Sequence, residues 1–117
     1  MPATIRRIVV SVAELGRAVT FYRDGLGLDL TQQVAGVAFL RTGGGVELML
    51  HERDAVPSDL AVTAGFGVAG IAESTERALA HGGALVEAPA RQPWGEWMSI
   101  VRDPDGHLVC LYEPASD

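Results

Sequence analysis

The sequence predicts an α+β domain of two tandem strand–helix–strand–strand–strand modules that form a curved, open-barrel-like mixed sheet with a concave pocket. The hydrophobic pattern changes from strand period to helix period and back in each half of the chain. A shift of 56 residues also superposes the halves at strand, helix and turn positions, which indicates a duplication. The shift places Val12 on Val68, Leu15 on Ile71, Gly27 on Gly83 and Leu30 on Val86.

The first module is predicted over residues 5–51. A β-branched run at residues 5–12 is typical of a mostly buried strand. Apolar residues then recur at helical spacing from Leu15 until Gly25 and Gly27 end the helix. Gly36 and a turn of three glycines separate the remaining strands, which are expected over residues 28–34, 37–41 and 46–50.

The second module is predicted over residues 61–114, after a linker at about 52–60 that carries Pro57. It repeats the order of the first, with a strand at 62–68 and a helix at 71–80 that stops at two glycines. The last three strands are expected over residues 84–87, 97–101 and 108–112, and the turn sequence Asp-Pro-Asp-Gly joins the final pair. Neither module alone can cover its sheet, so the two should pack as a single domain over residues 1–117.

The amino-acid composition argues against several classes of function. The net charge of −6 argues against a nucleic-acid partner, because phosphate binding requires a basic face. All basic residues are arginine, which leaves no lysine for Schiff-base chemistry. Cys110 is the one cysteine, so no intrachain disulfide is expected. No apolar run is long enough to span a bilayer, so we expect a cytoplasmic protein without a membrane partner.

Three segments carry a resemblance to a known family. They are FYRDGLGL at residues 21–28, VEL at 46–48 and RDPDGH at 102–107. In this order and spacing, the chain resembles the vicinal oxygen chelate superfamily of glyoxalases, bleomycin resistance proteins and dioxygenases, over about residues 5–114. The resemblance implies a homodimer with small-molecule pockets lined by the concave sheets.

Metal-dependent members of that superfamily hold a cation with histidines or glutamines and glutamates on the first and last strand of each module. The matching positions are Arg7, Glu47, Thr63 and Cys110. Only Glu47 matches the family pattern, and an arginine cannot act as a ligand because it stays protonated. We therefore expect a protein without a metal or other cofactor, in which Arg7 neutralises Glu47 across the sheet.

Strand alternation suggests which side chains face the pocket. Met49 shares a face with Glu47, and its flexible thioether suits irregular ligands, although a strand methionine is more often core. The two tryptophans flank Gly95 and Glu96, where they could stack on a planar ligand or instead fill the core and a dimer interface. The expected ligand-binding residues are Arg7, Ser11, Phe39, Glu47, Met49, Thr63, Trp94, Trp97 and Cys110.

The leading hypothesis is a metal-free binding protein that sequesters an aromatic or amphipathic natural product or antibiotic, with no catalytic residue. The alternative is a lyase, isomerase or dioxygenase of the same superfamily that uses Glu47 as a base or metal ligand. The neighbouring Arg7 would weaken Glu47 as a base, which counts against this alternative. A third option, a domain that recruits another protein, has no specific support in the sequence.

Overall fold

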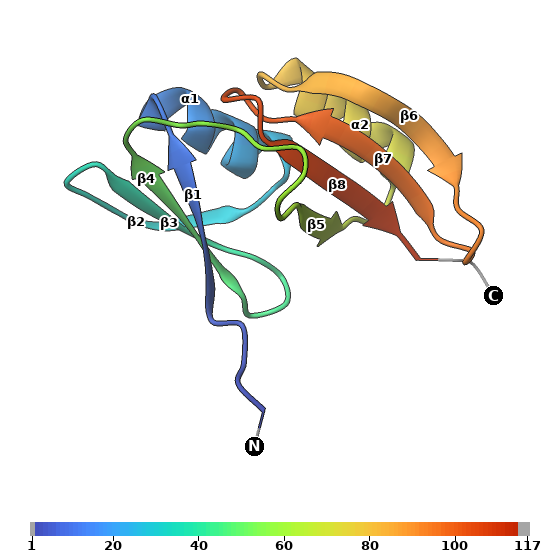
Figure 1. Ribbon diagram of the computed structural model, residues 1–117, viewed down its shortest axis with the longest axis horizontal. Coiled ribbons are helices and arrows are strands. Elements are labelled where there is room, and N and C mark those ends of the chain that lie inside the picture. The colour runs from blue at the N-terminus through green and yellow to red at the C-terminus, as the bar shows by residue number, and fades with distance from the viewer. Residues whose placement is uncertain (1, 115–117) are drawn as a thin grey trace.

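The computed structural model describes residues 2–114, and its two halves share one topology (Figure 1). One four-stranded sheet has the order β1-β4-β3-β2 and the other has the order β5-β8-β7-β6. Two α+β modules of the predicted kind are therefore confirmed. Within the described residues no ladder joins β1 to β5, so the molecule contains two separate mixed sheets rather than one continuous open barrel.

The elements follow the predicted order. The first module contains β1 (Arg7–Val12), α1 (Leu15–Val19), η1 (Thr20–Gly25), β2 (Asp29–Val34), β3 (Val37–Arg41) and β4 (Glu47–Glu52). The second contains β5 (Ala64–Gly67), α2 (Ile71–Ala80), β6 (Ala84–Arg91), β7 (Trp97–Arg102) and β8 (Leu108–Glu113). None of these helices is long and apolar enough to cross a membrane.

The first helix widens into a π-helix, η1, that the sequence did not predict. The Leu26 amide donates to the Phe21 carbonyl at 3.1 Å, five residues back. Gly25 ends η1 where α2 crosses it, and a Cβ atom there would lie 3.4 Å from His81 Cβ and 3.5 Å from Ala78 Cα. A glycine at this position lets the helices of the two modules approach closely.

Each module caps its own helix with a glutamate from the end of its last strand. Glu52 of β4 accepts a hydrogen bond from the Leu15 amide at 2.8 Å, and Glu113 of β8 accepts one from the Ile71 amide at 2.8 Å. A carboxylate at this end satisfies an unpaired amide and favours the positive pole of the helix. The same arrangement therefore recurs in both halves of the duplicated chain.

Alternation along the strands gives each sheet one covered and one open face. Leu48 and Leu50 of β4 are fully buried, whereas Glu47, Met49 and His51, which alternate with them along the strand, are only partly buried. The helix of the module packs on the side of the buried residues. We call the opposite side the open face, and in the first sheet it carries Arg7, Val9 and Ser11 of β1, Phe39 of β3, and Glu47, Met49 and His51 of β4.

Polar contacts join the first helix to the turn between β7 and β8. The Tyr22 hydroxyl donates to Asp103 Oδ2 at 2.6 Å, and both side chains are buried. The other Asp103 oxygen accepts the amides of Asp105 and His107, each at 2.9 Å. Asp105 in turn accepts the Ala13 amide at 2.8 Å. This network ties the turn of the second module to the start and the end of the first helix.

The Tyr22→Phe variant should lower the free energy of unfolding by about 1–3 kcal/mol, because it leaves a buried Asp103 oxygen without its donor. Urea denaturation measures this loss. Tyr112→Phe is the matched control, since that partly buried ring lies on the open face, and it should cost less. Equal losses in the two variants would contradict a special role for the buried hydroxyl.

Alkaline pH should weaken the same contact. Burial, followed by the charge and hydrogen bond of Asp103, raises the pKa of Tyr22 well above its ordinary value of 10.0. The folded state therefore holds this proton more tightly than the unfolded chain does, and the resulting stability is complete below about pH 10 and is lost as pH rises further. Unfolding free energies from pH 8 to 11 should fall less steeply in Tyr22→Phe than in Tyr112→Phe.

Candidate ligand-binding site

Arg7, Glu47 and Phe39 form a cluster on the open face of the first sheet. Arg7 and Glu47 are direct neighbours on β1 and β4, and their side chains form an ion pair at 2.7 Å. The Arg7 guanidinium also lies 5.2 Å from the centre of the Phe39 ring, within cation–π range. Glu47 is thus neutralised across the sheet as the sequence predicted, and the arginine is held over an aromatic surface.

Met49 and Ser11 extend this cluster along the open face. Met49 is paired with Phe39 across β3 and β4, so both lie on the face predicted for them. The Ser11 hydroxyl accepts a hydrogen bond from Arg53 Nε at 2.7 Å. Arg53 begins the linker between the modules, so this bond holds the linker beside the open end of β1.

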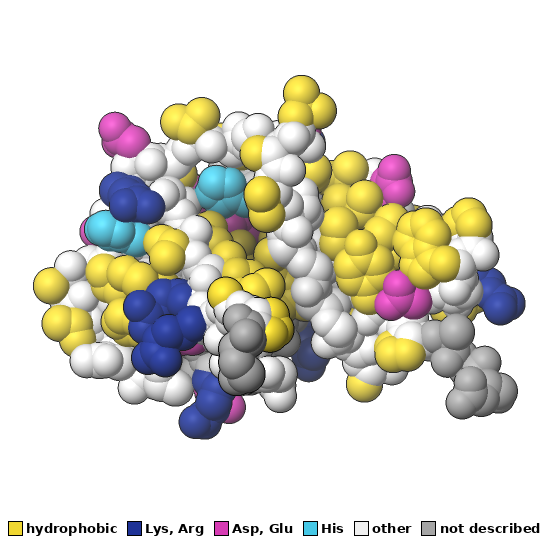
Figure 2. Space-filling model, turned by 60° about the horizontal axis from the view of Figure 1, so that its bottom comes forward, with side chains coloured by type: hydrophobic (Ala, Val, Ile, Leu, Met, Phe, Trp, Pro, Cys, Tyr) yellow, Lys and Arg dark blue, Asp and Glu magenta, His cyan; other side chains and the backbone are white. Residues whose placement is uncertain are grey.

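A cavity of about 700 Å³ lies between the modules, a size common for small-molecule sites. Consecutive residues of β1 and β5 line it, so it runs along the edges of these strands and not only over one face. We call it the seam cavity. Its lining consists of residues 8–11, 62–65 and 107–109 with Ile5, Tyr22, Asp54 and Val56. Figure 2 shows exposed hydrophobic side chains gathered around a hollow on one side of the molecule.

Two of the predicted residues, Ser11 and Thr63, line the seam cavity together. They come from opposite modules, so the cavity requires both halves of the chain. The side chains of Arg7, Phe39, Glu47 and Met49 lie on the adjoining open face instead. The structure therefore brings six of the nine expected residues to the seam cavity and the surface beside it.

Cys110 lies on the open face of the second sheet, between Gly65 on β5 and Ile100 on β7. Burial raises the pKa of its thiol, although a hydrogen bond with Tyr112 acts in the opposite direction. The Tyr112 ring covers Gly65, where a Cβ atom would lie only 2.8 Å from the ring. Cys110 is therefore a neutral thiol in a small apolar surface and a poor nucleophile.

The residues at the family's ligand positions do not fit a metal ion. Among residues 2–114 there is no group of three or more His, Cys, Asp or Glu side chains that could hold one. The resemblance matches Cys110 to Glu47, as the ligand positions on the last strands of the two modules. The strand registers match Cys110 to Met49 instead. Cys110 pairs with Gly65, and the shift of 56 residues relates Gly65 to Val9, whose partner is Met49 and not Glu47.

The tryptophans lie apart from this cluster. Alternation on β7 places Trp97 on the same side as Ser99 and Val101, which are buried on the helix-covered face, and away from the open face. Trp94 lies in the preceding turn, is 62% exposed and donates from Nε1 to Glu96 at 2.7 Å. A role for either tryptophan in ligand binding stays a prediction.

Sequence reasoning missed the part played by His107. Its Nε2 atom donates to the Ser11 carbonyl at 2.7 Å, which connects the second module to the outer edge of β1. The sequence indicates only that this residue follows the Asp-Pro-Asp-Gly turn. The signal that could have identified it is its place after the Asp-Pro-Asp-Gly turn, since that turn is anchored to the first helix.

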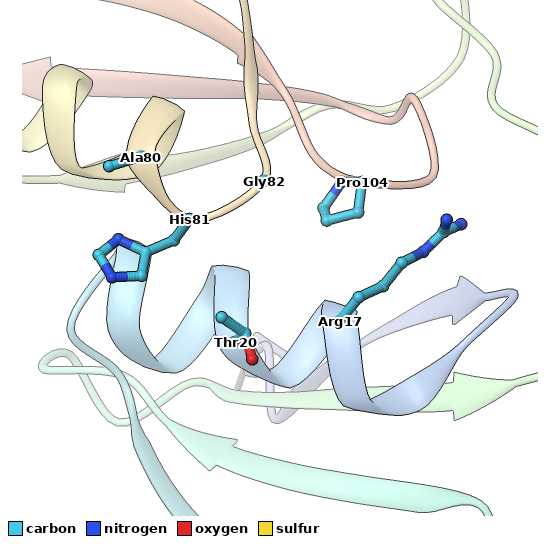
Figure 3. A pocket seen from close by; sticks show the side chains of 6 residues that line it. All are labelled: Arg17, Thr20, Ala80, His81, Gly82 and Pro104. Carbon is cyan, nitrogen blue, oxygen red and sulfur yellow. The ribbon is translucent and has the colours of Figure 1, made fainter.

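A second depression of about 480 Å³ lies on the helical side, between the first helix and the end of α2. Figure 3 shows Arg17 and Thr20 on one wall, with Ala80, His81, Gly82 and Pro104 opposite. Arg17 already contacts Asp105 at 3.1 Å, and His81 Nδ1 contacts the Arg77 carbonyl at 2.8 Å. Its polar groups are engaged within the protein, so we regard the seam cavity as the better candidate.

A double-mutant cycle should show how strongly Arg7 and Glu47 are coupled. Both side chains are 34% exposed, so we expect a coupling of about 0.5–1 kcal/mol from Arg7→Met and Glu47→Gln. Urea denaturation of the four proteins measures it. The more exposed pair Arg41 and Asp29, at 3.5 Å, is the matched control and should show a smaller coupling.

Comparisons with known proteins agree with this fold. A family model described as the Glyoxalase/Bleomycin resistance protein/Dioxygenase superfamily matches residues 4–111. A glyoxalase-related enzyme from Fulvimarina pelagi is 22% identical with a TM-score of 0.82, covering 94% of this chain and 87% of that one. No curated protein matches the chain.

Two further solved structures have the same fold. A glyoxalase/bleomycin resistance protein/dioxygenase family enzyme from Burkholderia phytofirmans PsJN is 14% identical with a TM-score of 0.84, covering 95% of this chain and 98% of that one. A lactoylglutathione lyase from Agrobacterium tumefaciens is 23% identical with a TM-score of 0.74, covering 97% and 95%. At these identities the likeness establishes the fold and not the activity.

Proposed function

Because the chain belongs to the glyoxalase/bleomycin resistance protein/dioxygenase superfamily, we propose that it is a metal-free, cytoplasmic small-molecule binding protein. Its ligand would be an aromatic or amphipathic natural product or antibiotic, which it sequesters without chemical change. The observation that carries this proposal is the ion pair between Arg7 and Glu47. That pair places a permanent cation beside the one carboxylate among the expected metal-ligand positions.

The surroundings of the ion pair suit an apolar, planar ligand. Phe39 and Met49 lie side by side on the open face, and aromatic and thioether groups both pack well against flat rings. The adjoining seam cavity is lined mainly by aliphatic residues. Burial of apolar surface, at about 25 cal/mol per Å², would supply most of the binding free energy.

We also propose that the protein acts as a homodimer. Large hydrophobic side chains are exposed near the linker and the N-terminal segment, and Ile5, Leu60 and Val62 are 71%, 97% and 93% exposed. Exposed apolar surface of this kind is typical of interaction sites. Light scattering coupled to size exclusion should give twice the mass of 12.4 kDa.

Binding can be tested with a panel of planar and cationic antibiotics, using titration calorimetry and amide chemical shifts. Active compounds should shift Val9, Phe39 and Met49, with unchanged affinity in excess EDTA. Phe39→Ala should weaken binding about tenfold, since a stacked aromatic contact contributes about 0.5–1.5 kcal/mol beyond its buried area. Val34→Ala on the outer strand β2 is the control and should leave the affinity unchanged.

Other outcomes would favour an enzyme. Loss of a 2-oxoaldehyde hemithioacetal, or oxygen uptake with a catechol, that disappears in Glu47→Gln would replace the binding proposal with a lyase or dioxygenase. Stoichiometric iron, zinc, nickel or manganese in protein purified without chelator would point the same way. No binding by any compound at millimolar concentration would reject the sequestration role.

A further inference from the structure

Arg53 places an unneutralised cation at one end of the open face of the first sheet. Its Nε atom donates to the Ser11 hydroxyl at 2.7 Å, and within residues 2–114 its guanidinium forms no ion pair. At the other end of the same face, Arg7 is neutralised by Glu47 at 2.7 Å. The two ends of the face therefore differ in charge, and the Arg53 end can accept an anionic group.

Two further hydrogen-bonding side chains lie beside Arg53. Ser11 of β1 and His51 of β4 are direct neighbours in the parallel ladder, and both belong to the open face. The Ser11 hydroxyl accepts from Arg53, and its own proton has no acceptor in the described part of the chain. Unlike the other two histidines, His51 makes no hydrogen bond within the described residues. Because an imidazole carries an N–H in either protonation state, three donors gather at this point.

An apolar surface begins directly beside these donors. Val37 of β3 is the ladder partner of His51, and Phe39 and Met49 form the next pair on the same face. Two residues along a strand span about 7 Å, which is the spacing between the donors and the Phe39–Met49 pair. Ser11 also lines the seam cavity. The donors therefore lie where the open face and the seam cavity meet.

The charge at this end favours an acceptor with one negative charge. The fork of N–H groups on an arginine matches both carboxylates and phosphates. Asp54 follows Arg53 in the chain, is exposed and lines the seam cavity, so it would repel a second negative charge. One free arginine beside one aspartate therefore suits a carboxylate better than a doubly charged phosphate.

We propose that Arg53, with Ser11 and His51, binds the carboxylate of an aromatic acid whose ring lies on Phe39 and Met49. This inference rests on the proposed small-molecule binding function and names the class of ligand. The ring and the carboxylate of such a ligand would be about 7 Å apart, to match the spacing along the strands. Apolar contact would hold the ring, and charge-assisted hydrogen bonds would hold the carboxylate.

Three probes that share one ring and differ in charge test the proposal. They are naphthylacetate, the neutral naphthylacetamide and the cationic naphthylmethylamine. In calorimetry at low salt, naphthylacetate should bind about tenfold more tightly than either of the others, because it alone offers a charged acceptor to the arginine. Its binding should shift the amides of Ser11, His51, Arg53, Phe39 and Met49. Equal affinity for the acetate and the acetamide, or no shift at millimolar naphthylacetate, would overturn the proposal.

A charge-neutral variant tests the role of Arg53 itself. Arg53 is exposed, so Arg53→Gln should leave the fold intact. It should weaken naphthylacetate binding about tenfold, because the charge-assisted hydrogen bonds are lost, and leave naphthylacetamide binding unchanged. Arg91→Gln is the matched control, since it removes the same charge from the end of β6, at the far edge of the second sheet. Equal weakening by both variants would mean that net charge attracts the ligand without a specific site.

The sign of the ligand charge has its own test. Asp54→Asn removes a like charge, so it should strengthen naphthylacetate binding about twofold to threefold at low salt. Weaker binding by this variant would contradict an anionic ligand at this end of the face.

Two outcomes distinguish this site from the binding function on which it rests. Naphthylacetamide binding that is as tight as naphthylacetate binding, and as sensitive to Phe39→Ala, would reject the carboxylate site and keep the binding function. Acetate alone that displaces naphthylacetate at equal concentration would show an anion site without recognition of the ring, which would also reject the proposal.

Discussion

Parallel pairing of the first and last strand in each module is the constraint on which the rest of the structure depends. Parallel strands cannot be joined by a tight turn, so the chain between β1 and β4, and between β5 and β8, must cross one face of its sheet. The helix of the module makes that crossing and covers one face. The other face stays open, and the first strand is left at an edge. The open faces and the seam cavity both follow from this topology.

The two modules differ on their open faces. The first sheet presents the charged and aromatic cluster around Arg7, Glu47 and Phe39. The second presents the Cys110 thiol and the Tyr112 ring over a bare glycine. The helix caps have not diverged in this way, since both modules keep a glutamate at the end of the last strand that caps the helix. The shared helix caps maintain the topology, and the side chains that differ give each open face its own chemistry.

The sequence predicted the modules and most strands because hydrophobic period and glycine turns are local signals. Helix α2 occupies the predicted residues 71–80, where a clear helical period ends at two glycines. Strand β6 runs to Arg91, beyond the predicted Glu87, because Pro89 is tolerated on an edge strand. The π-helical turn depends on contact with α2, and the Ser11–His107 bond joins residues 96 apart. Such features depend on tertiary packing and have no local signal.

The ion pair on the first sheet and the adjoining seam cavity together suggest how a ligand would be selected. The Arg7 side chain is committed to Glu47 and Phe39 on the open face, and the seam cavity is lined mainly by aliphatic residues. Under the proposed function, an amphipathic ligand would place its flat ring against Phe39 and its aliphatic part in the seam cavity. Neither module could bind such a molecule alone, because the seam exists only between them.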